Sequence, residues 1–163
     1  MAYRLVSEHP EHEAGIERVL DRAFGPGRFA KTSERVRERG AAPEPELSRV
    51  ALNEADEVIG VCRLWRIRIG AAPLHFLGPL AVDPAHQGDR LGLALAKGAV
   101  DAARASGGAG IVLVGAEPFF RPLGFSQIPQ GRVLMPGPVA AHRFLWLELI
   151  PGAFDHARGE ITS

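Results

Sequence analysis

The stretch "AVDPAHQGDRLGLALAKG", residues 81–98, joins the end of an apolar segment to a run of small and apolar residues. Gly88 and Gly92 flank a short charged turn, so the stretch predicts a strand, a tight turn and then a helix. The first amides of a helix have no acceptor within it, and the helix dipole adds partial positive charge there. Such a turn therefore favours a phosphate group. The turn is neither a G-x-G-x-x-G fingerprint nor a P-loop.

The segments on either side of this turn predict a βαβ unit. Residues 74–82 form a nearly continuous apolar run, which is typical of a central strand buried on both faces. A helix is expected over residues 89–106, ended by Gly107 and Gly108, and a second buried strand over residues 110–115. Two strands joined in this way run parallel. Pro79 cannot donate to a strand ladder, so we expect a bulge there, or a place where the strand parts from a neighbour.

The rest of the chain predicts a mixed α/β domain over residues 1–163, with a central mixed sheet flanked by helices. The expected order is β-α-α-β-β-β-α-β-α-β-β. Residues 58–69 alternate, which places Ile59, Val61, Trp65, Ile67 and Ile69 on one side of a strand. The other expected segments are strands at 3–7, 47–53, 133–134 and 144–150, helices at 9–24, 28–39 and 117–123, and a Pro-rich loop at 41–45. The last apolar strand either pairs across a homodimer or completes the sheet.

Composition excludes several classes of protein. The 163 residues are 46% hydrophobic and 23% charged, which suits a packed core. The formal net charge is zero, so we expect no nucleic-acid partner and no polybasic membrane contact. The single cysteine, Cys62, allows no internal disulfide and no cysteine-based zinc site. Without a signal peptide or a long apolar span, the chain is expected to be soluble and cytoplasmic.

Two stretches resemble the GNAT superfamily of acyl-CoA-dependent N-acetyltransferases: "LGPLAVDPAHQGDRLGLAL" (77–95) and "GIVLVGAEPFFRPLGF" (110–125). Gln87-x-x-Arg90-x-Gly92 matches the first and last positions of the family's pyrophosphate signature, and residues 123–125 match its closing motif. The resemblance implies acetyl-CoA as co-substrate, with no metal, in a V-shaped opening between the strands 74–82 and 110–115. It implies these cofactor-binding residues: Leu80, Ala81 and Val82 along the pantetheine arm, Gln87, Gly88, Asp89, Arg90, Leu91, Gly92 and Leu93 around the pyrophosphate, and Phe120.

Arg90 departs from the family pattern, in which glycine is commonest. Its side chain either crowds the loop and weakens the grip on the phosphates, or reaches them with a charge-assisted hydrogen bond. The backbone N–H is present in both cases, so we expect binding to be retained.

Acetyl transfer to an amine requires a neutral amine close to the thioester carbonyl, a path for its proton, and a donor for the oxyanion. The two positions at which the family often carries a catalytic acid or base hold Phe120 and Phe76. Glu117 is then a candidate base, or a carboxylate satisfied at a helix start. His75 is a second candidate base, or a packed histidine. Cys62 has no obvious partner base and is expected to be a core residue, so direct transfer without an acyl-enzyme is favoured.

The acceptor is expected to be a primary amine of a small molecule or of a protein. Arg28 and Lys31 lie in the segment that the resemblance assigns to the acceptor site, although an ordinary solvated loop explains them too. Two other readings remain open at this level: a non-catalytic acyl-CoA-binding regulatory domain, and a relative that has lost the cofactor.

Overall fold

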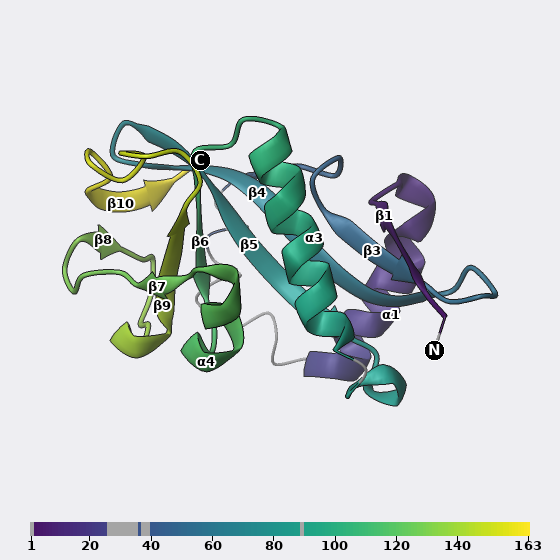
Figure 1. Cartoon of the computed structure of the whole chain (residues 1–163). Coiled ribbons are helices and arrows are strands. Elements are labelled where there is room, and N and C mark those ends of the chain that lie inside the picture. Colours follow the sequence, from purple (N-terminus) through teal and green to yellow (C-terminus); the bar gives the residue numbers. More distant parts are fainter. Residues whose placement is uncertain (1, 26–35, 37–39, 89) are drawn as a thin grey trace.

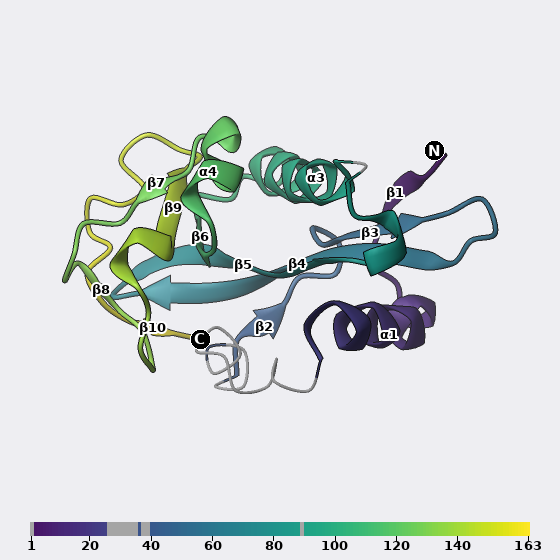
Figure 2. The ribbon, with the colours of Figure 1, turned by 90° about the horizontal axis from the view of Figure 1, so that it is seen from below.

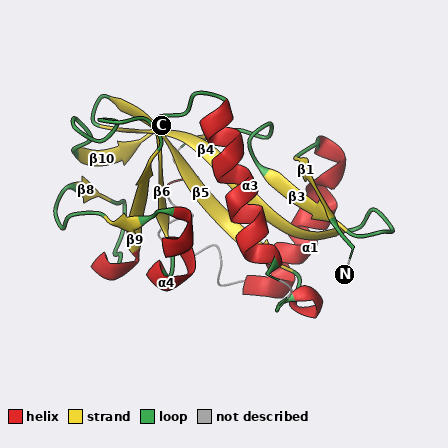
Figure 3. Ribbon diagram, viewed as in Figure 1, coloured by secondary structure: helices red, strands yellow, loops and turns green. Residues whose placement is uncertain are grey.

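The structure is a computed structural model in which residues 2–25, 36, 40–88 and 90–163 are described. A twisted mixed sheet runs through it in the order β1-β3-β4-β5-β6-β9-β7, with β2, β8 and β10 joined at its margins. The strands are β1 Arg4–Ser7, β2 Ala42–Pro43, β3 Arg49–Leu52, β4 Val58–Ile69, β5 Ala72–Val82, β6 Gly110–Val114, β7 Ser126–Gln127, β8 Val133–Leu134, β9 Phe144–Glu148 and β10 Gly159–Thr162. The helices are α1 Glu13–Phe24, α3 Leu91–Ala105 and the short α4 Glu117–Phe120 (Figures 1 and 3).

The long antiparallel hairpin of β4 and β5 forms the centre of the sheet. β4 has the predicted bounds, and β5 begins two residues before the predicted strand 74–82. Burial alternates along the second half of β4, as the pattern predicted, whereas its first five residues are all buried. Along its other edge, β4 pairs in turn with β3, then with β2 at Trp65 and Arg66, and then with β10 at Arg68 and Ile69. Segments from both halves of the chain therefore depend on one strand for their register.

The two long helices cover opposite faces of the sheet (Figure 2). Ile16, Val19 and Leu20 of α1 are buried against one face. On the other face α3 buries Leu91 and Leu95 together with a stripe of small residues, Ala96, Ala99 and Ala103. Small side chains let a helix approach a sheet closely, and a Cβ on Gly60 of β4 would lie only 2.7 Å from Leu95 Cδ1. The predicted α/β class and its flanking helices are confirmed.

The predicted βαβ unit is confirmed, and its two strands separate early. β5 and β6 are parallel, but their ladder contains only the pairs His75 with Ile111 and Phe76 with Val112. On the other side of β5, the register with β4 shifts between Cys62 and Leu64, opposite the Gly78–Pro79 peptide, which is cis. The irregularity predicted from Pro79 thus coincides with the point at which β5 leaves β6.

Several sequence predictions need correction. Ile59 does not share a side with Val61: it packs in the cluster under α3, whereas Val61 faces α1. The cause is a register shift beside Ala51, which inserts one extra residue into β4. Residues 41–45 were expected to be a loop, yet Ala42–Pro43 forms β2.

Other predictions on the remaining segments had mixed outcomes. The short strands β7 and β10 were not predicted. The last apolar strand completes the sheet, since β9 pairs with both β6 and β7. The predicted helix 28–39 lies almost wholly outside the described residues.

The packing of α3 makes a direct prediction about stability. Leu95 is fully buried between α3 and the sheet, so Leu95→Ala should lower the free energy of unfolding by about 2–5 kcal/mol. Lys97→Ala, on the exposed side of the same helix, should change it by no more than about 0.5 kcal/mol. Urea unfolding followed by circular dichroism measures both. Equal losses in the two variants would contradict the packing described.

Candidate active site

The turn between β5 and α3 is anchored at its start by Asp83, a buried carboxylate. Asp83 accepts a hydrogen bond from the amide of Ala85 at 3.0 Å and an ion-paired one from Arg22 Nη1 of α1 at 2.9 Å. A buried charge is stable only when it is paired and hydrogen-bonded. The pairing therefore fixes the first residues of the turn to the helix on the other face of the sheet.

The end of the turn has the shape of an anion site. Gly88 has φ +102° and Arg90 has φ +58°, both in the left-handed region, and a Cβ on Gly88 would meet nothing within 4 Å. Arg90 is the N-cap of α3 and makes no side-chain capping bond. The first amides of α3 consequently have no acceptor within the helix and lie at its positive end. Asp89 is outside the described residues.

Beside this turn β5 and β6 diverge in Figure 1 toward the end where α3 begins, and we call the region between their diverging backbones the opening. Because the parallel ladder ends at Phe76 and Val112, β6 takes no backbone partner from Leu80–Val82. Trp65 of β4 supports the diverging segment: its indole Nε1 donates a hydrogen bond to the Gly78 carbonyl at 2.6 Å. Leu80–Val82 pair with β4 on one side, and on the side where β6 would pair only the Val82 carbonyl has a partner among the described residues, Gln87 Nε2 at 3.4 Å. This edge of β5 is therefore open to an extended ligand.

Two phenylalanines of α4 have different positions at this opening. Phe119 is exposed over 39% of its surface, and its ring lies beside α3, since a Cβ on Gly92 would be 3.5 Å from it. Phe120, predicted to bind the cofactor, is only 6% exposed, and its ring packs edge-on against Phe125 in the core. The ring that borders the turn is therefore Phe119, which the sequence analysis did not select.

The candidate base Glu117 is committed to an ion pair. Both of its carboxylate oxygens accept hydrogen bonds from Arg121 Nε at 2.8 Å, four residues later, at the start of the 3-10 turn that follows α4. This pairing lowers the pKa of Glu117 below its ordinary value. A carboxylate held in this way is a weak proton acceptor at neutral pH.

The candidate base His75 lies on the closed side of the opening. It pairs across β5 and β6 at the last rungs before the strands diverge. Its Nε2 is 3.7 Å from Glu44 Oε1, and neither ring nitrogen makes a hydrogen bond. Burial lowers the pKa of His75, although Glu44 opposes that shift. This placement favours a structural role for the imidazole.

The other predicted residues are placed as follows. Cys62 is fully buried, and burial raises the pKa of its thiol, so it is a core residue without nucleophilic character. Arg28 and Lys31 lie outside the described residues. Among the residues that the structure describes, no group of three or more histidine, cysteine or acidic side chains could hold a metal ion. In the same part of the chain, no helix has the length and apolar character needed to span a membrane.

The comparisons with known proteins agree with this geometry. The model of the acetyltransferase (GNAT) family matches residues 14–125. Fold and match together define an acetyltransferase, as the sequence resemblance implied. The chain belongs to the GNAT family. No curated protein matches the sequence at a significant level.

Solved structures of this family superpose closely on the chain. The GNAT N-acetyltransferase YhbS from Escherichia coli, in complex with CoA, has a TM-score of 0.81 at 24% identity, covering 98% of this chain and 88% of that one. A GNAT acetyltransferase from Brucella melitensis, in complex with acetyl-CoA, has a TM-score of 0.63 at 26% identity, covering 94% and 99%. The ribosomal-protein-S18-alanine N-acetyltransferase of Escherichia coli has a TM-score of 0.63 at 17% identity, covering 91% and 94%.

Sequence reasoning missed two residues that shape the site, Trp65 and Asp83. Trp65 was assigned to a strand face only, and its bond to Gly78 depends on a register shift that periodicity does not reveal. Asp83 carried a usable signal, because Asp-Pro directly after a buried strand is a common turn and cap sequence.

Replacing Trp65 tests how the diverging segment is held. Trp65→Phe keeps an aromatic ring but leaves the Gly78 carbonyl without its donor, which should cost about 1–3 kcal/mol of stability. We also expect faster amide hydrogen exchange in Leu80–Val82. Trp146→Phe, which alters an indole stacked on Phe154, is the control and should leave exchange in Leu80–Val82 unchanged. Identical exchange in wild type and Trp65→Phe would argue against this support.

The lowered pKa of His75 predicts a pH dependence of stability. In the unfolded chain the imidazole titrates near its ordinary value of 6.5, whereas the folded protein binds this proton less readily. The unfolded state therefore gains protons first as the pH falls, and stability is lost below about pH 6.5. His75→Gln should lose less stability than wild type between pH 7.5 and 5.5 in urea unfolding. A parallel decline in both proteins would contradict the assignment.

Proposed function

We propose that this chain is an N-acetyltransferase that transfers an acetyl group directly from acetyl-CoA to a primary amine of a small molecule or a protein. The observation that carries the proposal is the early end of the β5–β6 ladder beside the free N-terminus of α3. The whole chain, residues 1–163, would act as one domain, since its last strand β10 pairs with β4.

Acetyl-CoA fits the described residues in two places. The pyrophosphate would accept hydrogen bonds from the backbone amides of residues 87–93. A ligand can approach Gly88 closely, because no described residue beyond its immediate chain neighbours lies within 4 Å of the position that a Cβ would occupy there. The pantetheine amides would pair with the backbone of Leu80–Val82, which β6 leaves unpaired. Bound there, acetyl-CoA supplies the activated thioester that is the acyl donor. Phe119, exposed beside Gly92, would cover one side of the bound molecule.

The chain's own contribution to the chemistry would be mainly positioning. A neutral amine attacks the thioester carbonyl, the tetrahedral oxyanion collapses, and the CoA thiolate leaves. Holding the two reactants in place provides much of the acceleration for such a reaction. With Glu117 bound to Arg121 and His75 behind the last β5–β6 rungs, water is the proton acceptor that we propose.

The first test is calorimetric titration of the protein with acetyl-CoA, using adenosine as control, followed by an amine panel with detection of released thiol. We expect binding in the micromolar range that requires the pyrophosphate, and thiol release with at least one amine. Absence of binding would exclude the proposal. Binding without turnover for any small amine or amine-bearing peptide would point to a regulatory domain instead.

The side chain of Arg90 can be tested separately from its backbone. Arg90 is exposed and its side chain makes no hydrogen bond or ion pair with the described residues, so its guanidinium is free to reach a phosphate. Arg90→Gln should weaken acetyl-CoA binding about tenfold by removing a charge-assisted hydrogen bond. Arg90→Gly should weaken it too, while relieving a left-handed conformation that disfavours side chains. Tighter binding by Arg90→Gly would show that the arginine obstructs the loop.

Glu117 provides the test of the proposed proton path. Because its carboxylate is held by Arg121, Glu117→Gln should leave kcat and the acidic limb of the pH–rate profile close to those of wild type. His75→Gln should likewise retain kcat. A fall of about a hundredfold or more in either variant, with loss of the acidic limb, would identify that residue as a general base.

A further inference from the structure

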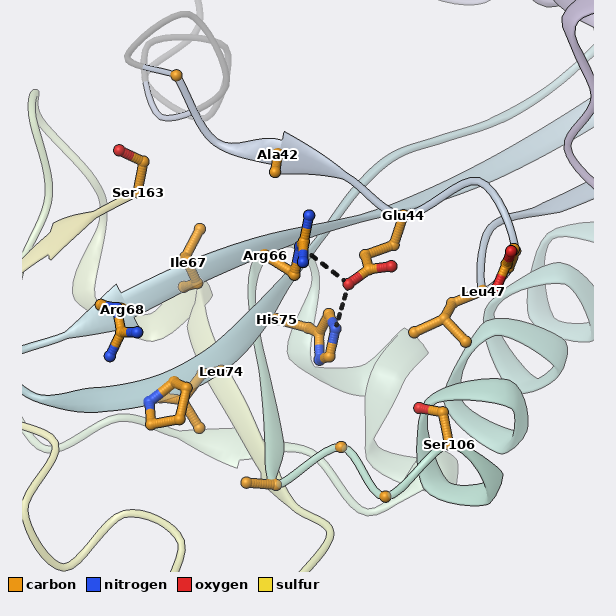
Figure 4. Close-up of a pocket in the computed structure, with 16 residues that line it drawn as sticks. Ala42, Glu44, Leu47, Arg66, Ile67, Arg68, Leu74, His75, Ser106 and Ser163 are labelled. Atoms are coloured by element: carbon orange, nitrogen blue, oxygen red, sulfur yellow. Dashed lines mark ion pairs between the residues drawn. The ribbon is translucent and has the colours of Figure 1, made fainter.

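A cavity lies at the C-terminal end of α3, away from the proposed acetyl-CoA site (Figure 4). Its volume is about 720 Å³, within the range of small-molecule sites. The early part of β5 and the neighbouring part of β4 form its floor, and the loop after α3 forms one wall.

The cavity is separate from the proposed active site. α3 has 15 residues, which at 1.5 Å each span roughly 22 Å. The turn that would bind pyrophosphate precedes the helix, and the cavity borders Ser106 and Gly107, which follow it. The rungs His75–Ile111 and Phe76–Val112 close the sheet between the cavity and the opening. An amine held in the cavity is therefore not placed for attack on the thioester.

One side of the cavity is positively charged. Arg66 and Arg68 lie two residues apart on β4, so their side chains leave the same face of the strand. Arg66 Nε is already paired with Glu44 Oε1 at 3.1 Å, and His75 Nε2 approaches the same oxygen. Arg68 is exposed and its side chain has no ion pair or hydrogen bond within the described residues. A carboxylate is the natural partner of a guanidinium in this position.

Leu47 and Ser106 border the cavity on the side away from Arg68 (Figure 4), and Glu46, the sequence neighbour of Leu47, adds a negative charge to the lining. Glu46 lines the cavity and its carboxylate has no ion pair within the part of the chain that the structure describes. The C-terminus of α3 contributes the negative end of the helix dipole, which favours a cation. The hydroxyl of Ser106 donates to Ala103 O, so its own oxygen is left to accept a hydrogen bond.

We propose that this cavity binds a small zwitterion, an amino acid or short peptide, with its carboxylate at Arg68 and its ammonium at Glu46 and the C-terminal end of α3. Two walls of opposite charge explain why neither Arg68 nor Glu46 has a partner of its own. The site stands independently of the proposed acetyl transfer, because none of its residues belongs to that site apart from the structural histidine His75.

The test is calorimetric titration of the full chain, without acetyl-CoA, with L-alanyl-L-alanine. The matched probes are the N-acetylated dipeptide, which lacks the ammonium, and the dipeptide amide, which lacks the carboxylate. We expect the zwitterion to bind and each capped probe to bind at least about tenfold more weakly, as expected for loss of a charge-assisted bond. Absence of dipeptide binding at about 10 mM, a limit that corresponds to negligible affinity, or equal binding of a capped probe, would overturn the proposal.

Single substitutions locate the binding. Arg68→Gln and Glu46→Gln should each weaken dipeptide binding about tenfold, and both residues are exposed, so folding should be preserved. Arg158→Gln removes an exposed arginine outside the cavity and should leave binding unchanged; an equal loss in this variant would mean nonspecific attraction and overturn the site. Acetyl-CoA affinity, measured on the same variants, should stay at the wild-type value, so failure of this site is distinguishable from failure of the acetyl-CoA site.

Discussion

The two rungs that join β5 to β6 are the constraint on which the rest of the site depends. They hold the two strands parallel at one end. Because the ladder stops after these two rungs, the later residues of β5 have no partner strand on the β6 side. The chain crosses from β5 to β6 through α3, and this connection places the N-terminus of α3 beside the unpaired end of β5. The opening and the turn that we propose to bind pyrophosphate both follow from one connection, so the βαβ unit carries most of the geometry of the proposed site.

A strand that leaves its neighbour needs support from elsewhere. Trp65 holds the Gly78 carbonyl from β4, and Asp83 ties the end of β5 to Arg22 of α1. Both contacts come from the face or edge that β6 does not occupy. The divergent segment of β5 is thus held by polar bonds at its two ends, while the alanine-rich side of α3 packs over the middle. Such a segment can bind an extended ligand without having to be ordered by it.

The sequence predicted the parts of the fold in which one pattern dominates. In residues 74–115, continuous apolar runs and glycine pairs predict a strand, a helix and a second strand. The irregularity at Pro79 was predicted from the missing N–H of proline. Predictions were wrong or absent where long-range pairing decides. Ile59 lies on the opposite face of β4 from Val61 because of a bulge, which periodicity does not reveal. Strands of two residues, such as β2 and β7, are too short to show a period at all. The burial of Phe120 beside an exposed Phe119 depends on how a four-residue helix is rotated, which apolar patterning cannot specify.

The pairing of β10 with the far end of β4 has a consequence for how this chain is made. Ile161 lies beside Ile69, a contact that spans about ninety residues of sequence and closes a very long loop. During synthesis from the N-terminus, the first half of the chain can form its hairpin and bury α1, but this margin of β4 stays uncovered until β10, Gly159–Thr162, has been made. An uncovered strand margin invites pairing with other chains. The nascent protein would therefore be vulnerable to misassembly at this margin for as long as β10 is missing.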